Sequence, residues 1–266
     1  ATNKDCLPEY CNMPNPKTLE FVGDRNYQGD LKSFFVKTNT DDKLNLLKSL
    51  IYKIGNEPTI IFCNHREAVE RINDLLFEHG IPTGIFHGAL KQEHRERELI
   101  KLRNQSSNIL LATDLASRGI DIPSIKNVIH YQIPLKEDAF IHRNGRTARM
   151  EANGNSFIVL KADEKLPDFA PTEIEEFPLD TLSDVDLTTD YVTMYINLGK
   201  KNKINKVDIV GLFYKKGGLV KDELGKVEVL DYCAYVAVKR TKSKELIRLL
   251  KNEKIKKQSF LVAVSR

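Results

Sequence analysis

The sequence contains no apolar run close to the ~20 residues that cross a bilayer, and it does not open with the charged and apolar segments of a secretory signal. Its 266 residues are 41% hydrophobic and 29% charged, which is the composition of folded domains and not of a disordered chain. That length allows one large domain or two ordinary ones. We expect a cytoplasmic protein, monomeric and without membrane contact.

Cysteine is scarce, with only Cys6, Cys11, Cys63 and Cys233. The first two are close enough to form half of a metal site, but no second cysteine or histidine pair with ligand spacing follows them. We therefore expect no metal site in this chain, and reduced thiols as in cytosolic proteins.

The net charge of +4 conceals a separation of charge along the chain. Residues 192–266 hold 18 lysines and arginines against 7 acidic residues, a net charge of +11, whereas the rest of the chain holds 23 basic and 30 acidic residues. An acidic stretch, 163–190, separates the two parts. A basic terminal module favours a polyanionic partner, although a solvated lysine-rich surface would give the same count.

Strands and helices alternate between residues 31 and 160. Apolar periodicity predicts strands at 31–37, 59–63, 83–86, 108–112, 127–131 and 155–160. Thr40 and Asn64 are expected to cap the first two helices between them, and Gly55 and Gly80 to close these helices. Several strands are apolar on both faces, as buried parallel strands are. The pattern predicts an α/β fold with a doubly wound parallel sheet, whose ligands bind at the carboxyl ends of the strands.

After the acidic stretch the predicted order changes to βαββαβ. Strands are expected at 193–198, 226–230, 234–238 and 260–264, and helices at 203–214 and 243–250. This order is that of a small α+β domain of the split βαβ type.

Three arginines, Arg143, Arg146 and Arg149, fall within seven residues. Guanidinium groups so concentrated repel one another unless an anion joins them, and phosphate suits their planar fork. If the segment is helical, Arg146 and Arg149 share a face with His142. The alternatives are an exposed arginine-rich helix and pairing with the nearby Asp114.

A second polar segment surrounds Asp121, which follows a glycine and precedes a proline. Its carboxylate could accept hydrogen bonds from a ribose, or it could serve as a turn residue or pair with the arginines. Thr113 and Gly119 offer a hydroxyl and a close backbone approach to a phosphate.

In this order the segments resemble motifs of the DEAD-box helicases. The resemblance to motifs V and VI lies in ATDLASRGID (112–121) and HRNGRTAR (142–149), and that to motifs IV and IVa in IIFCN (60–64) and HGALKQEHR (87–95). It covers residues 30–162 and implies a RecA-like fold. Three positions depart from the family pattern: Asn144 replaces a hydrophobic residue, Ala148 a glycine, and His65 the commoner threonine.

The resemblance implies a role for each matching residue. Arg146 and Arg149 would act in catalysis as arginine fingers that bind the γ-phosphate of ATP, and Asp121 and Gly119 would join them in cofactor binding. His142 would contact the opposing domain. The residues that line the RNA would be Asn64, Gly88, Gln92, Arg95 and Thr113.

The sequence contains neither a Gly-x-x-x-x-Gly-Lys-Ser/Thr loop nor an Asp-Glu-Ala-Asp quartet. ATP and Mg²⁺ would therefore be held mainly by a first RecA-like domain of the same protein. By itself this chain should not hydrolyse ATP measurably.

The terminal module resembles an RNA-recognition motif (RRM). The segment MYINLG (194–199) looks like its RNP2 strand, and Tyr195 and Tyr235 would stack on bases or simply pack. A second candidate RNA surface is cationic and consists of Lys200, Lys201, Lys203, Lys239 and Arg240. The combination with a DEAD-box core is similar to the DbpA subfamily, which implies tethering to a 23S ribosomal RNA hairpin during large-subunit assembly.

The sequence thus predicts four segments: a remnant or linker from a first RecA-like domain (1–29), a second RecA-like domain (30–162), an acidic linker (163–190) and an RRM-like domain (191–266). The expected function is the C-terminal part of an ATP-dependent RNA helicase that unwinds RNA duplexes locally. The alternatives are a non-catalytic RNA-binding adapter with a relict RecA-like domain, which would not need two arginine fingers, and a DNA helicase, which would not need an RNA-recognition fold.

Overall fold

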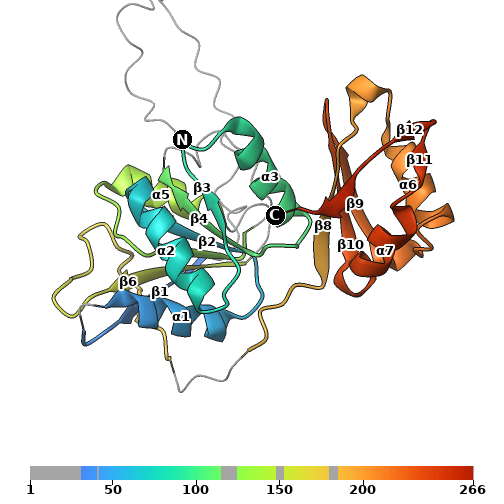
Figure 1. The fold of residues 1–266 in the computed structure, drawn as a ribbon. Helices are drawn as coiled ribbons and strands as arrows, with labels where there is room; N and C mark the ends of the chain where they lie inside the picture. Colours follow the sequence, from blue (N-terminus) through green and yellow to red (C-terminus); the bar gives the residue numbers. More distant parts are fainter. Residues whose placement is uncertain (1–30, 41, 115–124, 148–152, 180–184, 266) are drawn as a thin grey trace, which may run out of the picture.

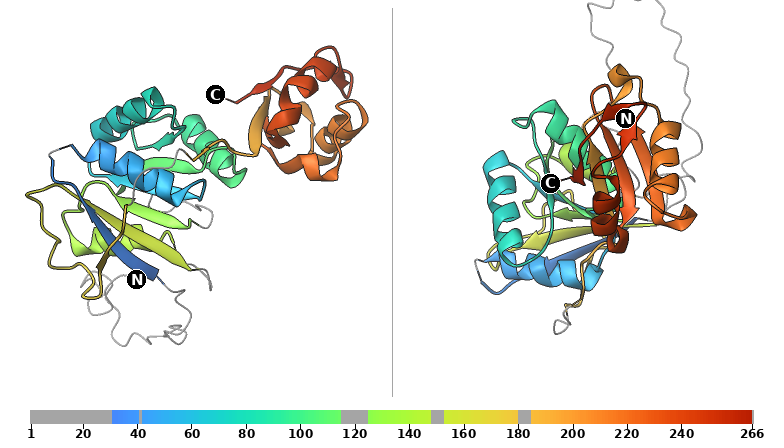
Figure 2. Two further views of the ribbon diagram at one scale, coloured as in Figure 1. Left: turned by 90° about the horizontal axis from the view of Figure 1, so that it is seen from below. Right: turned by 45° about the vertical axis from the view of Figure 1, so that its right-hand side comes forward.

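The computed structural model describes residues 31–40, 42–114, 125–147, 153–179 and 185–265. They form two domains that lie side by side, each with its own sheet and apolar core (Figure 1, Figure 2). Among these residues no helix is long and apolar enough to cross a membrane.

The first domain is built on a seven-stranded sheet in the order β3-β4-β2-β5-β6-β1-β7, in which every pairing is parallel. Its strands are β1 (Leu31–Lys37), β2 (Thr59–Cys63), β3 (Gly84–Phe86), β4 (Ile109–Thr113), β5 (Asn127–His130), β6 (Gly154–Leu160) and β7 (Glu175–Glu176). Its helices are α1 (Lys43–Ile54), α2 (Arg66–Glu78), α3 (Gln92–Arg103) and α5 (Glu137–Asn144).

The sheet is covered on both faces. Helices α1 and α2 share an apolar cluster with Ile61 and Cys63 of β2, whereas α3 packs with Ile60 and Phe62 of the same strand on the other face. The side chain of Phe140 places α5 on the face of β6 that bears Ile158. Because successive residues of a strand point to opposite faces, β2 is buried along its whole length. The predicted doubly wound α/β fold is confirmed.

Two predicted helix caps are wrong. Helix α1 is capped not by Thr40 but by Asp42, whose carboxylate accepts a hydrogen bond of 2.8 Å from the backbone N–H of Leu44. Helix α2 follows His65 and not Asn64, since the Asn64 side chain is used in tertiary hydrogen bonds.

Gly55 and Gly80 adopt φ of +74° after the ends of α1 and α2. Glycine enters this left-handed region at little cost, so the prediction that these residues close the two helices is confirmed.

The second domain contains a four-stranded antiparallel sheet in the order β13-β8-β10-β9. Its strands are β8 (Tyr191–Ile196), β9 (Leu224–Val229), β10 (Ala234–Lys239) and β13 (Val262–Val264), and its helices are α6 (Lys206–Lys215) and α7 (Ser243–Leu250). A short hairpin, β11 (Lys254–Ile255) with β12 (Gln258–Ser259), precedes the last strand. The predicted βαββαβ order is confirmed, with boundaries shifted by up to three residues.

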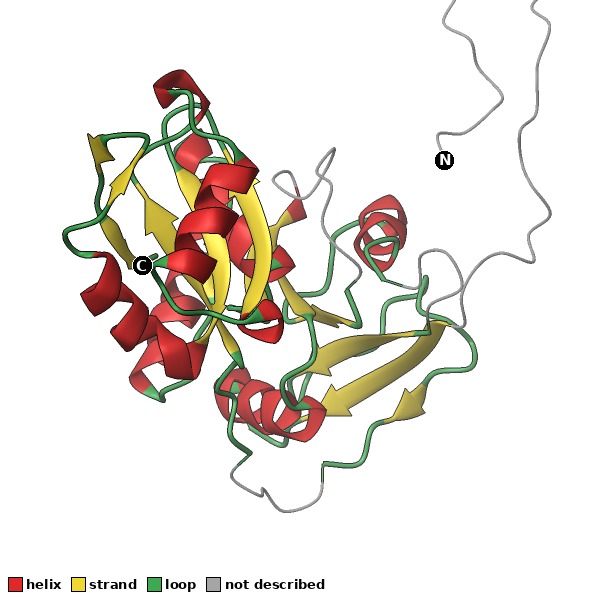
Figure 3. Ribbon diagram, turned by 90° about the vertical axis from the view of Figure 1, so that its right-hand side faces the viewer, coloured by secondary structure: helices red, strands yellow, loops and turns green. Residues whose placement is uncertain are grey.

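Both helices of the second domain lie on the same face of its sheet (Figure 3). Their residues Phe213 and Leu246 share one core with Met194, Ile196 and Val236. The helices leave the opposite face, which carries Thr193, Tyr195 and Tyr235, outside this core.

The acidic stretch predicted as a linker contributes to the first domain. Strand β7 extends the sheet by pairing Glu175 with Phe34 of β1. The ring of Phe177 contacts Phe34 and Phe157, with centroid distances of 5.3 and 5.1 Å. The segment therefore follows the sheet edge before it reaches the second domain, and the division at 162 and 190 stays our proposal.

Candidate functional site

The polar residues singled out in the sequence gather at the carboxyl edge of the first sheet, defined here as the ends of β3, β4, β2 and β5. Thr113 is the last residue of β4, and Asn64 directly follows β2. Gly88 follows β3 and is exposed, while Gln92 and Arg95 lie in the first turn of α3. Because parallel strands end at the same edge, residues from three separate parts of the sequence come together there.

Arg143 of α5 holds this edge together. Its Nε and Nη2 atoms donate to the two carboxylate oxygens of Asp114 at 2.6 and 2.8 Å. Nη2 also donates to Oδ1 of Asn64 at 2.8 Å, and Nη1 donates to the carbonyl of Gln132 at 2.7 Å. The guanidinium carbon lies 5.1 Å from the ring centre of Phe62. For Arg143, pairing with Asp114 is thus the correct interpretation of the arginine cluster.

The helical segment ends before Arg146. Helix α5 stops at Asn144, and the N–H of Arg146 donates to the carbonyl of Arg143 at 3.1 Å within a turn. A shared face for His142 and Arg146 depended on a helix through both residues, and this condition is not met. His142 is exposed and Arg146 is half-buried. Three further predicted residues, Arg149, Asp121 and Gly119, lie outside the described residues.

A buried polar triad beneath α5 was not predicted from the sequence. Oδ1 of Asn144 lies 2.9 Å from Nε2 of His130 and accepts a 2.8 Å hydrogen bond from the Ser156 hydroxyl. Burial, with a smaller contribution from the positive charge of Arg143, lowers the pKa of His130 to about 3. The imidazole is therefore neutral at neutral pH, with Nε2 as the donor.

Thr113 and Asn64 are less accessible than Gly88 and Gln92, two of the other predicted RNA residues. Thr113 is 8% exposed. The Asn64 amide donates to the carbonyl of Ile133 at 3.0 Å, in addition to its contact with Arg143. Gly88 and Gln92 are exposed and Arg95 is half-buried. The accessible part of the predicted RNA surface thus lies at the start of α3.

The open face of the second sheet is covered in part by α3 and the loop after it. Asn104 donates to the hydroxyl of Thr193 at 3.0 Å, and the hydroxyl of Ser106 lies 2.6 Å from the same atom. Arg103 forms an ion pair of 3.4 Å with Glu228 of β9. Thr193 is consequently only 2% exposed.

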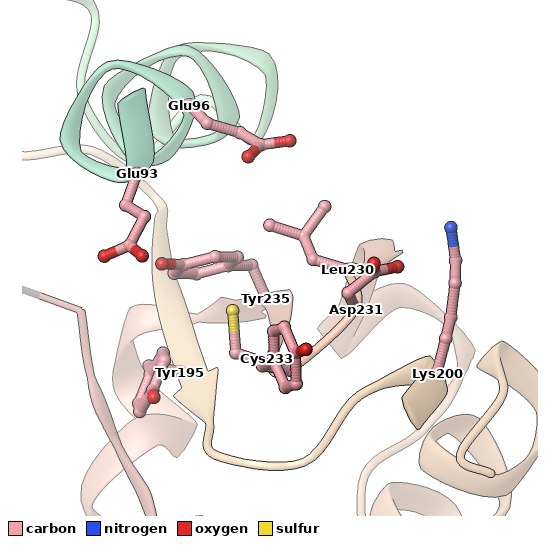
Figure 4. A pocket seen from close by; sticks show the side chains of 9 residues that line it. Glu93, Glu96, Tyr195, Lys200, Leu230, Asp231, Cys233 and Tyr235 are labelled. Atoms are coloured by element: carbon pink, nitrogen blue, oxygen red, sulfur yellow. The ribbon is translucent and has the colours of Figure 1, made fainter. Parts of the chain in front are cut away.

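The two tyrosines of this face lie beside a pocket that α3 closes on one side (Figure 4). Their ring centroids are 5.7 Å apart, and burial raises the pKa of both hydroxyls. Glu93 and Glu96 of α3 line the pocket of about 540 Å³ together with Tyr195 and Tyr235, and Asp231 and Lys200 line it as well, so its acidic side chains outnumber the lysine. Carboxylates so placed repel phosphate, and Tyr235 is 7% exposed. The arrangement favours packing over base stacking for this pair.

The predicted lysines after β8 are well placed for an anion. Lys200, Lys201 and Lys203 are exposed in and after a single helical turn, 200–202. Backbone hydrogen bonds of 2.8 Å from Lys200 and Lys201 to the carbonyls of Leu230 and Asp231 hold this turn. The approach is so close that a Cβ at Gly199 would meet the Leu230 oxygen at 2.4 Å. A glycine is required there, and the three ammonium groups extend from a fixed backbone.

The other two predicted cations contact the connecting segment. Arg240 donates from Nε to the carbonyl of Thr189 at 2.6 Å. Lys239 forms a 3.3 Å ion pair with Asp190 and lies over the ring of Tyr191. These contacts fix the connector against β10, so both residues have a structural role in addition to the predicted contact with RNA.

Comparison with known proteins accounts for both domains. Residues 42–151 match the helicase conserved C-terminal domain, and residues 193–264 match the DbpA RNA binding domain. The fold and the site thus define a protein with a helicase C-terminal domain joined to an RNA-binding domain. The two domains occur together and in the predicted order, so the expected combination of a helicase C-terminal domain with a DbpA RNA-binding domain is confirmed.

Relatives agree with this assignment. The chain is 28% identical to the ATP-dependent RNA helicase DbpA of Bacillus subtilis over 94% of its own length and 58% of that protein. It is 29% identical to the DbpA of Escherichia coli, over 84% of this chain and 50% of the other. The chain therefore spans between half and three fifths of these relatives.

Among solved structures, a DEAD box protein from Methanococcus jannaschii is similar at a TM-score of 0.50 and 25% identity. The match covers 56% of this chain and 42% of that one. It supports the RecA-like fold of the first domain.

Proposed function

We propose that this chain supplies the second half of an ATP-dependent RNA helicase, which closes on a first RecA-like domain over ATP and RNA. The observation that carries the proposal is the carboxyl edge of the first sheet. There Arg143 joins the ends of β4, β2 and β5, and its own carbonyl anchors the turn that presents Arg146. One edge thus carries both a candidate phosphate ligand and the candidate RNA residues.

On the nucleotide side the chain would contact mainly the γ-phosphate end of ATP, through Arg146 and through three residues outside the described part of the chain. Arg146 and Arg149 would neutralise charge that develops on the transferred phosphoryl group, an effect of order 10³–10⁵ in rate. Asp121 would accept hydrogen bonds from the ribose, and Gly119 would allow the close approach. No group of three or more His, Cys, Asp or Glu side chains that could hold a metal occurs among the described residues. Because the sequence contains neither a Gly-x-x-x-x-Gly-Lys-Ser/Thr loop nor an Asp-Glu-Ala-Asp quartet, ATP with Mg²⁺ would be held mainly by the first domain.

On the RNA side two surfaces contribute. Gly88, Gln92 and Arg95 would contact the sugar–phosphate backbone, with Thr113 and Asn64 behind them. Lys200, Lys201 and Lys203 would bind phosphates of a structured RNA, because exposed lysines give sequence-independent and salt-dependent affinity. A tether of this kind raises the local concentration of a duplex near the helicase core without adding chemistry.

By its similarity to the DbpA subfamily we further propose that the tether is a 23S ribosomal RNA hairpin, that the protein acts in large-subunit assembly in the cytoplasm, and that His142 contacts the first domain. A panel of ribosomal RNA hairpins tested against this chain, with matched DNA hairpins as controls, would identify the tether. Equal binding to RNA and DNA of every sequence would contradict it.

A non-catalytic RNA adapter is the competing proposal. To decide between them, the first RecA-like domain of Bacillus subtilis DbpA would be added to this chain, and ATP hydrolysis would be followed with and without hairpin RNA. The helicase proposal predicts RNA-stimulated turnover from the mixture and none from this chain alone. An adapter would bind RNA equally well and give no turnover in either case.

A further inference from the structure

The turn between β11 and β12 has a backbone conformation that a lysine adopts only with strain. The two strands pair with Ile255 opposite Gln258, so Lys256 and Lys257 alone connect them. The tight two-residue turn that joins such strands requires positive φ at both residues, which asparagine and glycine usually supply. Here Lys256 has φ of +48° and Lys257 has φ of +68°. Glycine would enter this region without strain.

The same conformation recurs in the lysine turn after β8. In the described part of the second domain, three non-glycine residues have positive φ, and all three are lysines: Lys203, Lys256 and Lys257. Lys203, with φ of +60°, ends the helical turn 200–202. Strained backbone persists only where the surrounding structure enforces it, and it is concentrated at functional sites. The three positions therefore point to a use for the lysine side chains.

The β11–β12 hairpin is fixed against this lysine turn. Nζ of Lys256 donates to the carbonyl of Lys203 at 2.8 Å and forms an ion pair of 2.7 Å with Asp208 of α6, beside which the hairpin lies (Figure 1). The Gln258 amide donates to the carbonyl of Asn202 at 3.0 Å. The two turns thus form one surface, and the ammonium group of Lys256 is used in holding them together.

The ammonium group of Lys257 is left for another partner. Lys257 is exposed, and within the described part of the chain its side chain forms no ion pair or hydrogen bond. The same holds for the three lysines of the 200–203 turn. Asp208, the carboxylate at this surface, is already paired with Lys256. Four unpaired cations on adjoining turns repel one another, and the phosphates of a polyanion would relieve that repulsion.

We propose that Lys257 is a further RNA phosphate ligand, which completes the cationic surface of the 200–203 turn. The inference rests on the proposed function, because that function assigns RNA to this turn. A ligand that contacts both turns at once must carry several phosphates in succession, as an RNA backbone does. The chain keeps a lysine where glycine would relieve strain, so it exchanges stability of the hairpin for affinity.

Lys257→Gly separates these two effects. The melting temperature, followed by circular dichroism, should not fall, because glycine adopts positive φ freely. Affinity for the tightest-binding hairpin of the ribosomal RNA panel, measured by fluorescence anisotropy, should fall about five-fold at ~0.1 M salt, and the slope of log affinity against log salt should decrease by about 0.7–0.9. Gln105→Gly is the matched control: this exposed residue of the first domain has φ of +54°, and its replacement should leave RNA binding unchanged.

Two further variants exclude a loosened turn as the cause. Lys257→Asn removes the charge with a residue that also tolerates positive φ, and it should lose affinity as Lys257→Gly does. Lys257→Arg keeps the charge and should keep the wild-type slope. Wild-type binding by Lys257→Gly, together with weakened binding when Lys200, Lys201 and Lys203 are changed to glutamine, would overturn the assignment of Lys257 alone. Wild-type binding by both variants would instead contradict the proposed function of the lysine turn.

Discussion

The Asn144 side-chain oxygen lies 2.9 Å from Nε2 of His130, inside the core and next to the helix turn that presents Arg146. The position of Asn144 is one at which the chain departs from the usual DEAD-box pattern. The structure explains why an asparagine stands here, since the imidazole of His130 and the hydroxyl of Ser156 both donate hydrogen bonds to its side-chain oxygen. A hydrophobic residue would leave those donors buried without a partner.

Asn144→Leu, which restores a hydrophobic residue, should therefore destabilise the first domain. Loss of one acceptor for two buried donors lowers the free energy of unfolding by about 1–3 kcal/mol. Chemical denaturation followed by circular dichroism measures the change. Adding Ser156→Ala to Asn144→Leu removes one of the orphaned donors and should recover part of the loss. An Asn144→Leu variant as stable as the wild type would show that the triad does not stabilise the core.

His130 makes the stability of the domain depend on pH. Its pKa is about 3 in the folded protein against 6.5 as the ordinary value. Between these values the unfolded chain binds a proton that the folded chain does not, so stability is lost as pH falls from about 6.5 toward 3, with a slope of up to about 1.4 kcal/mol per pH unit.

His130→Gln should flatten this slope above about pH 5, where few carboxylates titrate, while His94→Gln, on an exposed histidine, should not. Denaturation midpoints at several pH values give both slopes. Equal slopes for wild type and His130→Gln would mean that the buried imidazole does not set them.

The contact between α3 and the second sheet predicts that the domains can be locked together without loss of RNA binding. The hydroxyl oxygens of Ser106 and Thr193 are 2.6 Å apart, so cysteines at both positions bring their sulfur atoms close to the ~2.05 Å of a disulfide. With Cys6, Cys11 and Cys233 replaced by serine, the oxidised Ser106→Cys/Thr193→Cys chain should bind hairpin RNA within about two-fold of its reduced form.

This result is expected because Lys200, Lys201 and Lys203 stay exposed when the sheet face is covered. The reduced double variant is the control for the substitutions themselves. A large loss of affinity on oxidation, restored by reduction, would mean that RNA uses Tyr195 and Tyr235 on the covered face.

The same three lysines should determine the salt dependence of binding. Changing all three to glutamine should reduce the slope of log affinity against log salt by about two to three, since each neutralised phosphate contributes about 0.7–0.9. Fluorescence anisotropy with labelled hairpin RNA over a salt series measures the slope. Glutamine at Lys32, Lys37 and Lys165, exposed lysines of the first domain and of the segment that follows it, is the matched control. An unchanged slope for the first triple variant would exclude the turn as the phosphate contact.

Much of the fold follows from local patterns. The strand at 59–63 is a continuous apolar run, and the helix at 243–250 has its predicted bounds because its apolar residues recur at helical spacing. Cap positions were less predictable, because Thr40 and Asp42 are both good caps and the backbone angles at Asp42 decide between them.

The sequence predicted which residue types form the candidate site, but it did not predict the contacts that their side chains make. Arg143 and Arg146 are identical in chemistry, and only the end of α5 before Arg146 separates a buried anchor from a half-buried side chain. The docking of α3 on the second sheet could not be predicted, because Asn104, Ser106 and Thr193 are small polar residues without an apolar pattern. The buried role of His130 could not be predicted either, because its position at the end of a strand is one that many polar residues occupy.

Arg146 and Arg149 would complete an ATP site begun by another domain, and the proposed helicase function depends most directly on them. RNA-stimulated ATP hydrolysis by this chain together with the first RecA-like domain of Bacillus subtilis DbpA tests it. Arg146→Ala and Arg149→Ala should each lower kcat by about 10³, while Arg66→Ala leaves it unchanged and hairpin RNA still binds to every variant. Turnover that persists at the wild-type rate in both the Arg146→Ala and the Arg149→Ala variant would contradict the proposed helicase function.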